Sequence, residues 1–374
     1  MKQGISILTD SLRLLRSRHL FWLCLGLSLL ASVVLFGTYS FNDKGLRVLL
    51  FKTWENPELT AGSEGARLFV AYMFNSIFVG FWLSWGAIIL GVLSTASILP
   101  EFLSSGSIEL YLSKPMSRIA LLFWRVLGSL LFVLLQSAAG VLLAYLLMGF
   151  KFGVWLHEAL WAVPLLTLQF FYLYSVSALL AVITRSTLAC VIGTMLFWLA
   201  VFVIQFSSNR LTQISGETGK LIELARTRIE SIEHRVRDAG REMTEGERRA
   251  IGQAKEQIDR MTPMHEPTHR WARRMEAVKL VVPKTGDIQK IIANIANAPT
   301  ANELAAAANL GGAADQHLKD RGMSDDELND TKQAGAAGAR AIRVVDATKS
   351  IASSSAVSLS MLGLAAFLFR RRDF

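Results

Sequence analysis

Six long runs of uncharged residues constrain the fold of this chain more than any other feature of its sequence. They span residues 20–41, 68–99, 126–150, 159–183, 186–209 and 351–369. Each run reaches the roughly 18 apolar residues that a helix needs to cross a bilayer. Because 52% of the 374 residues are hydrophobic and only 18% are charged, the composition also indicates a membrane protein. We therefore expect an all-α polytopic membrane protein with six transmembrane helices, embedded in the lipid bilayer.

The first run has two interpretations, a transmembrane anchor or a cleaved signal peptide. Lys2, Arg13, Arg16 and Arg18 precede it, as basic residues precede the apolar region of a signal peptide. However, the run is longer than such a region, and no small-x-small cleavage site follows it. We expect an uncleaved anchor.

The basic residues of the short loops predict the orientation of the six helices. If both termini are cytoplasmic, eleven Lys and Arg residues of the termini and short loops lie inside and five lie outside. The five outer residues are Lys44, Arg47, Lys52, Arg67 and Lys151. The eleven inner residues are Lys2, Arg13, Arg16, Arg18, Lys114, Arg118, Arg125, Arg185, Arg370, Arg371 and Arg372. Since cytoplasmic loops carry the excess of Lys and Arg, we expect a multi-pass protein of the plasma (inner) membrane with cytoplasmic N- and C-termini.

A long charged insertion separates the fifth run from the sixth. Residues 207–350 hold 23 Lys and Arg against 21 Asp and Glu, and a loop of this length is exempt from the rule for basic residues. We expect three parts: a transmembrane domain over 1–206, a large helical extracytoplasmic domain over 207–350, and a sixth helix with a basic cytoplasmic tail over 351–374. A net charge of +2 on the insertion provides little attraction for phosphates, so we expect no nucleic-acid partner.

Helical periodicity continues into this insertion. Apolar residues recur at helical spacing over 221–239, and a capping box of Thr244 and Glu247 opens a second pattern after Gly240. These signals predict an antiparallel helical hairpin.

Two further signals follow the hairpin. An apolar stripe at residues 288, 291, 292 and 295 fits either a helix packed at the outer membrane surface or a core within the insertion. A second capping box, Ser324 with Glu327, opens a helix that leads toward the last span.

The insertion also contains the zinc-peptidase motif HExxH at residues 265–269. In a zinc site of this kind both histidines lie one turn apart on a continuous helix, and the glutamate polarises a bound water. Pro267 lies between the histidines and Pro263 precedes them. Because proline removes a helical hydrogen bond, we expect a turn here, with Pro267 starting the next helix, and no metal site.

A half-polar stretch, "PEFLSSGSIELYLSKPMSR" over residues 100–118, lies between the second and third runs. At about 2.5–3.5 kcal/mol for each charge at a membrane centre, Glu101, Glu109, Lys114 and Arg118 outweigh the gain from its few apolar residues. The stretch therefore stays outside the hydrocarbon, on the cytoplasmic side. It forms either an interfacial helix that anchors the loop or a docking element for a soluble partner.

This stretch is similar to a known family motif. A Gly followed by "IELYLSKPMSR", which runs directly into "IALLFWRVLG", resembles the cytoplasmic loop of permease subunits of ABC-2 type ATP-binding-cassette transporters. The six-span layout agrees, as do an amphipathic N-terminal segment and the closing "LFRRRDF". The resemblance covers about residues 1–206 and 351–374, whereas the insertion is larger than the usual family pattern.

The resemblance implies a role for the loop as the coupling helix that contacts an ATP-binding subunit. The residues that would make this contact are Gly106, Ile108, Glu109, Leu110, Tyr111, Lys114, Pro115 and Arg118. Glu109 and Arg118 would be the main polar contacts, and Pro115 would set the exit angle. The other interpretation of Arg118 is a side chain that extends to the lipid headgroups.

The chain has no ATPase motif of its own. "SGETGKL", residues 215–221, contains Gly-Lys but lacks the first glycine of GxxxxGK[ST] and has Leu after the lysine. We expect a non-enzymatic permease subunit, part of an exporter, with a second permease copy in a homo- or heterodimer. ATP and magnesium would bind the partner subunit, and this chain would hold no cofactor. Two alternatives are a membrane-anchored scaffold whose outer domain binds an envelope partner, and a membrane zinc peptidase.

Overall fold

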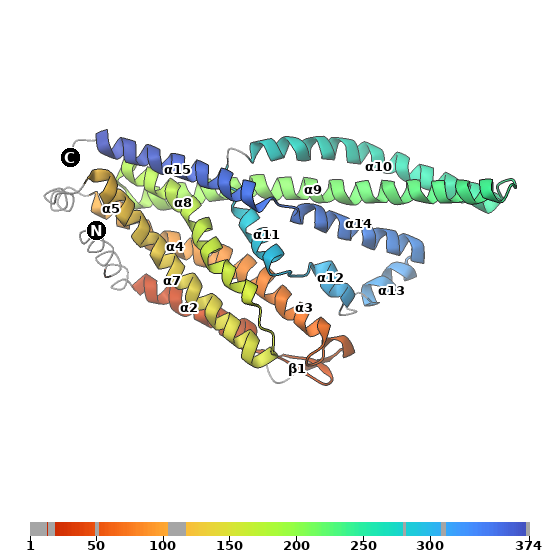
Figure 1. Ribbon diagram of the computed structural model, residues 1–374, viewed down its shortest axis with the longest axis horizontal. Coiled ribbons are helices and arrows are strands. Elements are labelled where there is room, and N and C mark those ends of the chain that lie inside the picture. Colours follow the sequence, from red (N-terminus) through yellow and green to blue (C-terminus); the bar gives the residue numbers. More distant parts are fainter. Residues whose placement is uncertain are drawn as a thin grey trace. The chain divides into compact units, whose positions relative to one another are not determined.

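The computed structural model describes residues 13, 19–48, 52–103, 117–279, 282–307 and 312–371. The described chain is mostly helical and divides into two compact units. The first unit comprises residues 1–203, 280–299 and 346–374, and the second comprises 204–279 and 300–345. Figure 1 labels the α-helices of both units and the first strand.

Six helical segments of the described chain are long and apolar enough to cross a membrane, which confirms the six spans expected from the sequence. They are α2 (His19–Gly37); α3, η2, α4 and α5 together (Glu64–Phe102); α7 (Arg118–Phe152); η3 with α8 (His157–Thr184); α9 (Thr187–Asp238); and α15 (Ala347–Arg371). The second segment changes winding along its length: α3 (Glu64–Tyr72) leads into the π-helical η2 (Met73–Ala87), then α4 (Ile88–Thr95) and α5 (Ile98–Phe102).

Local signals set the ends of these helices. Ser117 caps α7, where its side chain accepts a hydrogen bond from the Ala120 N–H at 3.2 Å. Gly153 ends α7 in the left-handed conformation, with φ of 69°, which a glycine adopts without steric cost. At the end of α2, Lys151 Nζ donates to the carbonyl oxygens of Phe36 and Gly37 at 3.2 and 2.5 Å. A cation from another helix thus satisfies carbonyl groups that α2 leaves unpaired.

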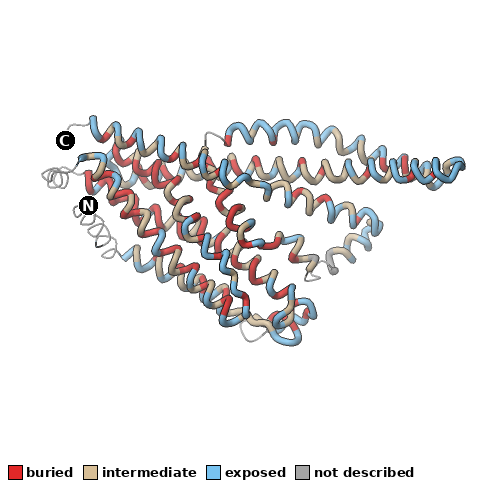
Figure 2. Tube along the Cα trace, in the orientation of Figure 1, coloured by how far each residue is buried: buried red, intermediate tan, exposed pale blue. Residues whose placement is uncertain are grey.

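The core of the first unit lies where α2, α7, α8 and α15 pack against one another, as the buried residues of Figure 2 show. Small residues allow close contact between α2 and α7. Ser32 Oγ donates to the Gly140 carbonyl at 2.9 Å, and a Cβ on Gly140 would lie 3.5 Å from the Ser28 side chain. In lipid the hydrophobic effect does not drive helices together. Close packing of small residues and hydrogen bonds from hydroxyl groups hold them together instead.

A short sheet follows α2 and departs from the expected all-α fold. β1 (Tyr39–Asn42), β2 (Gly45–Val48) and β3 (Lys52–Glu55) pair in that order as an antiparallel meander. The turn between β1 and β2 has only two residues, Asp43 and Lys44, and Gly45 follows at φ of 135°. "NDKG" between two apolar stretches was a hairpin signal in the sequence.

The second unit is a helical and highly charged part of the chain. Its long hairpin joins the later part of α9 to α10 (Glu245–Val278), with Ile232, Val236 and Ile251 buried near the turn. Both predicted capping boxes are confirmed: Thr244 with Glu247 opens α10, and Ser324 with Glu327 opens α14 (Asp325–Arg343). The remaining helices of this unit are α12 (Ala301–Ala307) and α13 (Gly312–Asp320).

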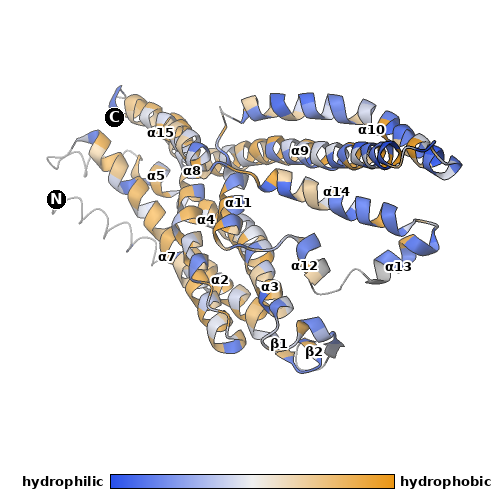
Figure 3. Ribbon diagram, turned by 45° about the vertical axis from the view of Figure 1, so that its right-hand side comes forward, coloured by the Kyte–Doolittle hydropathy of each residue, from blue (hydrophilic) through white to orange (hydrophobic). Residues whose placement is uncertain are grey.

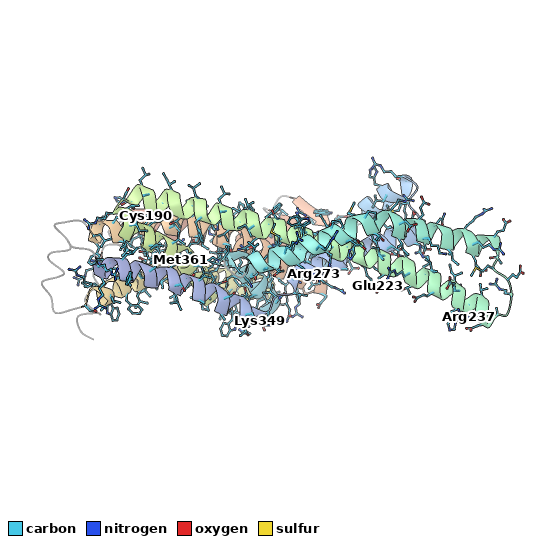
Figure 4. The ribbon with its side chains drawn as sticks, turned by 90° about the horizontal axis from the view of Figure 1, so that it is seen from above. Cys190, Glu223, Arg237, Arg273, Lys349 and Met361 are labelled. Atoms are coloured by element: carbon cyan, nitrogen blue, oxygen red, sulfur yellow. The ribbon has the colours of Figure 1, made fainter. Side chains whose placement is uncertain are left out.

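The colours of Figure 3 separate the hydrophobic spans such as α7 from the hydrophilic helices α10 and α14. Figure 4 labels Glu223 and Arg237 on α9 and Arg273 on α10, among the charged side chains of the hairpin.

The expected turn around Pro263 and Pro267 is wrong. Both prolines lie inside α10, which continues unbroken from Glu245 to Val278. Each proline costs the helix a hydrogen bond. The hydroxyls of Thr262 and Thr268 donate to carbonyls four residues earlier, at 2.7 and 2.6 Å, a type of bond that often bends a helix. Thirty-four residues of helix, packed along α9 near the turn, outweigh the local penalty.

The apolar stripe at 288–295 forms α11 (Thr285–Ile295), which belongs to the first unit. Ile288, Ile291 and Ile292 are buried where α11 contacts α8, η2 and η3. Asp287 accepts a hydrogen bond from Ser350 Oγ at 2.9 Å and so joins α11 to α15. Of the two arrangements open from the sequence, the stripe takes the one against the membrane helices.

Candidate functional site

Most residues of the predicted coupling element lie outside the described part of the chain. Gly106, Ile108, Glu109, Leu110, Tyr111, Lys114 and Pro115 all fall within residues 104–116, which the structure does not describe. Arg118 is described, as the first residue of α7. The structure therefore defines the site by the two chain ends that hold the element.

The chain enters the element from α5, which is buried in the core. Leu99, Phe102 and Leu103 are each 3% exposed or less. The helix begins at Ile98, and Pro100 lies in its first turn. Proline fits here because the N–H groups of a first helical turn have no partner within the helix.

The chain leaves the element at Ser117, the N-cap of α7. Leu121 and Leu122 follow in the first turns and are buried in the same core cluster as Leu99 and Phe102. Both ends of the element thus join one packed cluster.

Arg125 is a residue of this site that the sequence did not reveal. It was counted among the basic residues of the cytoplasmic side, but its side chain is only 3% exposed. Its guanidinium lies over the Phe102 ring, 5.2 Å from the centroid, and joins α7 to α5. The signal was its position in "LLFWRVLG", where helical spacing puts it on the buried face of Leu121, Leu122 and Ser129.

Two further contacts extend this cluster toward α8 and α15. Ser129 Oγ donates to the Tyr174 hydroxyl at 2.8 Å, and the Tyr174 ring stacks on Phe170. Phe102 also lies 6.3 Å from the Phe369 ring near the end of α15. Four of the spans therefore meet at the end of the unit that carries the element.

The polar residues of spans three and four serve helix packing. Gln136, Ser137, Gln169, Tyr172, Tyr174 and Ser175 are all buried. Gln136 Nε2 donates to Ser28 Oγ at 3.4 Å, and the Tyr172 hydroxyl lies 3.4 Å from Ser355 Oγ. These bonds join α7 to α2 and α8 to α15, so Gln136 and Tyr172 serve as contacts between helices.

The two segments that resemble enzyme motifs, "SGETGKL" and HExxH, both lie inside helices. "SGETGKL" lies in the middle of α9, where Thr218 Oγ1 donates to the Ile214 carbonyl at 2.8 Å. A phosphate-binding loop presents free backbone N–H groups to the anion, whereas the N–H groups inside a helix bond to carbonyls of the same helix. This segment therefore does not have the geometry of a phosphate-binding loop.

In the HExxH segment, His265 and His269 are stacked with ring centroids 5.7 Å apart. His265 Nδ1 is hydrogen-bonded to Thr218 Oγ1 at 2.9 Å. Because α10 is continuous, Pro267 no longer argues against a zinc site. A zinc ion, however, also needs ligands besides the two histidines. Within the described ranges, no three His, Cys, Asp or Glu side chains converge as a metal site would require.

Comparison with known proteins identifies the family. The family model described as ABC-2 family transporter protein matches residues 62–374, most of the chain and all but the first span. The chain belongs to the ABC-2 family. The searches found no match among curated proteins and none among solved structures. Membership agrees with the resemblance seen in the sequence and makes this multi-pass protein a membrane component of an ABC transporter.

Proposed function

We propose that this ABC-2 protein is the permease subunit of an ATP-driven exporter of the plasma membrane, with cytoplasmic termini. A separate subunit would bind ATP and magnesium and would dock on the element over residues 106–118. Two permease chains, identical or related, would form the transport path. Closure of the ATPase subunits would displace the element and tilt the second and third spans.

The anchoring of the element carries this proposal. Leu99, Phe102 and Leu103 fix the chain before it, while Leu121 and Arg125 fix the chain after it. Rigid attachment at both ends suits an element that transmits motion.

The test is co-purification of this chain with its ATP-binding subunit. Glu109→Lys and Leu110→Pro should reduce the amount of ATPase that co-purifies and abolish stimulation of its ATP hydrolysis in reconstituted vesicles. Glu58→Lys is the matched control, because it reverses an exposed carboxylate at the far end of the second span. Full association of both loop variants would contradict the coupling role.

A scaffold whose outer domain binds an envelope protein is the second candidate. The exposed side chains of Met264 and Trp271 on α10, at 55% and 51%, favour it, since exposed large apolar groups often mark contact sites. The same reconstitution separates the two functions. A permease complex hydrolyses ATP faster when this chain is present, whereas a scaffold leaves the rate unchanged.

A further inference from the structure

A small cavity lies in the first unit, at the end of the spans remote from the coupling element. It is formed where the end of α7, the start of α3 and the first strand meet, and its volume is about 60 Å³. Its walls include the cations Arg67 and Lys151, the hydroxyl of Ser63, and the rings of Phe41 and Phe152. Because a single water needs about 10–15 Å³ of such space, the cavity holds roughly five non-hydrogen atoms. This is the size of one phosphate group.

The sequence places this cavity at the edge of the hydrocarbon. Phe41 ends the first uncharged run, Arg67 directly precedes the second, and Lys151 directly follows the third. Three spans therefore pass from apolar to charged residues at the same cavity. The headgroup phosphates of a bilayer lie at this boundary.

The two cations are held differently. Lys151 is fixed, because two of its three N–H bonds donate to the last carbonyl oxygens of α2, and the third stays available. Arg67 forms a long ion pair of 3.9 Å with Glu64, and both side chains are exposed. Such a pair contributes little, so the five guanidinium donors of Arg67 can turn to an anion.

The aromatic wall distinguishes a lipid from a free anion. The rings of Phe41 and Phe152 are 5.4 Å apart in a T-shaped arrangement, and Lys151 Nζ lies over the Phe152 ring. A free phosphate would lose its hydration against these rings. A phospholipid instead brings its own apolar glycerol and acyl carbons to cover them.

We propose that this cavity binds the phosphate group of a phospholipid headgroup from the adjoining leaflet. Arg67 and Lys151 grip the phosphate oxygens, and the two phenylalanine rings contact the first carbons of the lipid. The bound lipid would bridge the first, second and third spans. This inference does not depend on the proposed transport function.

The experiment titrates the purified full-length protein, in detergent micelles, with dioleoyl phosphatidylglycerol and counts bound lipid by native mass spectrometry. Loss of a charge-assisted contact should weaken binding about tenfold in Arg67→Gln and in Lys151→Gln. Arg67→Lys should retain part of the affinity. The matched control is Lys44→Gln, which removes an exposed charge from the β1–β2 turn outside the cavity and should bind lipid as wild type does.

Two further ligands identify the source of the phosphate. Dioleoylglycerol, which has the same chains without phosphate, should not bind at the site, and inorganic phosphate at millimolar concentration should not displace the lipid. Displacement by inorganic phosphate would overturn the lipid assignment. Wild-type affinity in Arg67→Gln, or an equal loss in Lys44→Gln, would overturn the site itself. Because Lys151→Gln also removes a cap of α2, Arg67→Gln decides the outcome where the two variants differ.

Discussion

At the residue scale, Arg125 shows how a charge can form part of a membrane-protein core. Its side chain is almost fully buried and its guanidinium lies over the Phe102 ring, and the contact joins the two helices that flank the coupling element. Attraction between a cation and an aromatic face contributes about 2 kcal/mol when water is excluded and about 0.5–1 kcal/mol at exposed sites. Burial therefore decides how much a cation–aromatic pair contributes to stability.

Arg125→Ala should lower the free energy of unfolding by about 2–4 kcal/mol, because it removes both the ring contact and buried packing. Arg274→Ala is the matched control: Arg274 lies over Trp271 at the same 5.2 Å, but on the exposed surface of α10. Its loss should cost less than about 1 kcal/mol. Denaturant unfolding in mixed micelles, followed by circular dichroism, measures both. Equal effects would show that burial of Arg125 adds nothing.

Glu247 makes the turn of the α9–α10 hairpin sensitive to acid. The Arg241 guanidinium, bonded at 2.6 and 2.8 Å, and the Thr244 N–H lower the pKa of this carboxyl from its ordinary 4.5 to about 2. A depressed pKa means that the ionised group stabilises the folded state above the unfolded pKa. This contribution disappears as the pH falls from about 4.5 toward 2.

Hydrogen exchange at the Thr244 N–H tests this dependence, with each rate divided by the intrinsic rate at that pH. Wild type should be better protected than Glu247→Gln above pH 4.5, and the difference should vanish near pH 2. Glu245→Gln, which alters a neighbouring exposed carboxylate paired with Arg249, should leave the profile unchanged. A difference that persists at pH 2 would mean that packing, and not ionisation, protects the turn.

At the element scale, α14 approaches α9 so closely that only a glycine fits at one position. A Cβ on Gly338 would lie 2.9 Å from the Gln213 carbonyl oxygen, which belongs to the backbone and cannot turn aside. An ion pair of 2.9 Å between Arg228 and Asp330 joins the same two helices. Close backbone contact at one point and a charge pair at another fix how α14 lies on α9.

Gly338→Ala should therefore destabilise the second unit by about 1–3 kcal/mol, the usual cost of overpacking. Gly252→Ala is the matched control, because Gly252 lies inside α10 with nothing within 4 Å of its added methyl group. That change should stabilise the helix by about 0.5–1 kcal/mol through the lower entropy of the unfolded chain. Opposite signs in denaturant unfolding support the close contact, and a stabilising Gly338→Ala would rule it out.

The sequence predicts elements well where one physical requirement dominates. Uncharged runs gave the six spans because lipid tolerates few alternatives to a helix. The capping boxes at Thr244 and Ser324 gave two helix starts, since the pattern itself satisfies the first N–H groups. Predictions failed where a local signal competed with packing. Pro267 interrupts hydrogen bonding in α10, but the long helix continues past it.

The site was predictable only in part, for a related reason. The motif around Glu109 identified the family and the loop. Helical spacing places Arg125 on the buried face of α7, but its contact with Phe102 depends on how α5 and α7 meet, which no local pattern encodes. The cavity at Arg67 and Lys151 could not be predicted from the sequence either. There, each of these residues looks like an anchoring charge at the end of a span. Only the fold brings 67 and 151 to one cavity.

At the scale of the whole molecule, the number of spans fixes which loops share a side of the membrane. Between residue 107 and residue 242 the chain crosses three times, so these positions must lie on opposite sides. Between residues 44 and 242 it crosses four times, so these must lie on the same side. In the orientation that we propose from the excess of basic residues, residue 107 lies on the cytoplasmic side.

Cysteine labelling tests both the number of spans and their orientation in one experiment. Cys24 and Cys190 are fully buried, so the native chain should react slowly with a maleimide that does not cross membranes. In intact cells, Lys44→Cys and Glu242→Cys should react, whereas Ser107→Cys should react only after the membrane is opened. If Ser107→Cys and Glu242→Cys react together, an odd number of crossings between them is impossible and the six-span fold is wrong. If the pattern is reversed, the spans stand but the coupling element faces away from any cytoplasmic ATPase, and the permease proposal fails.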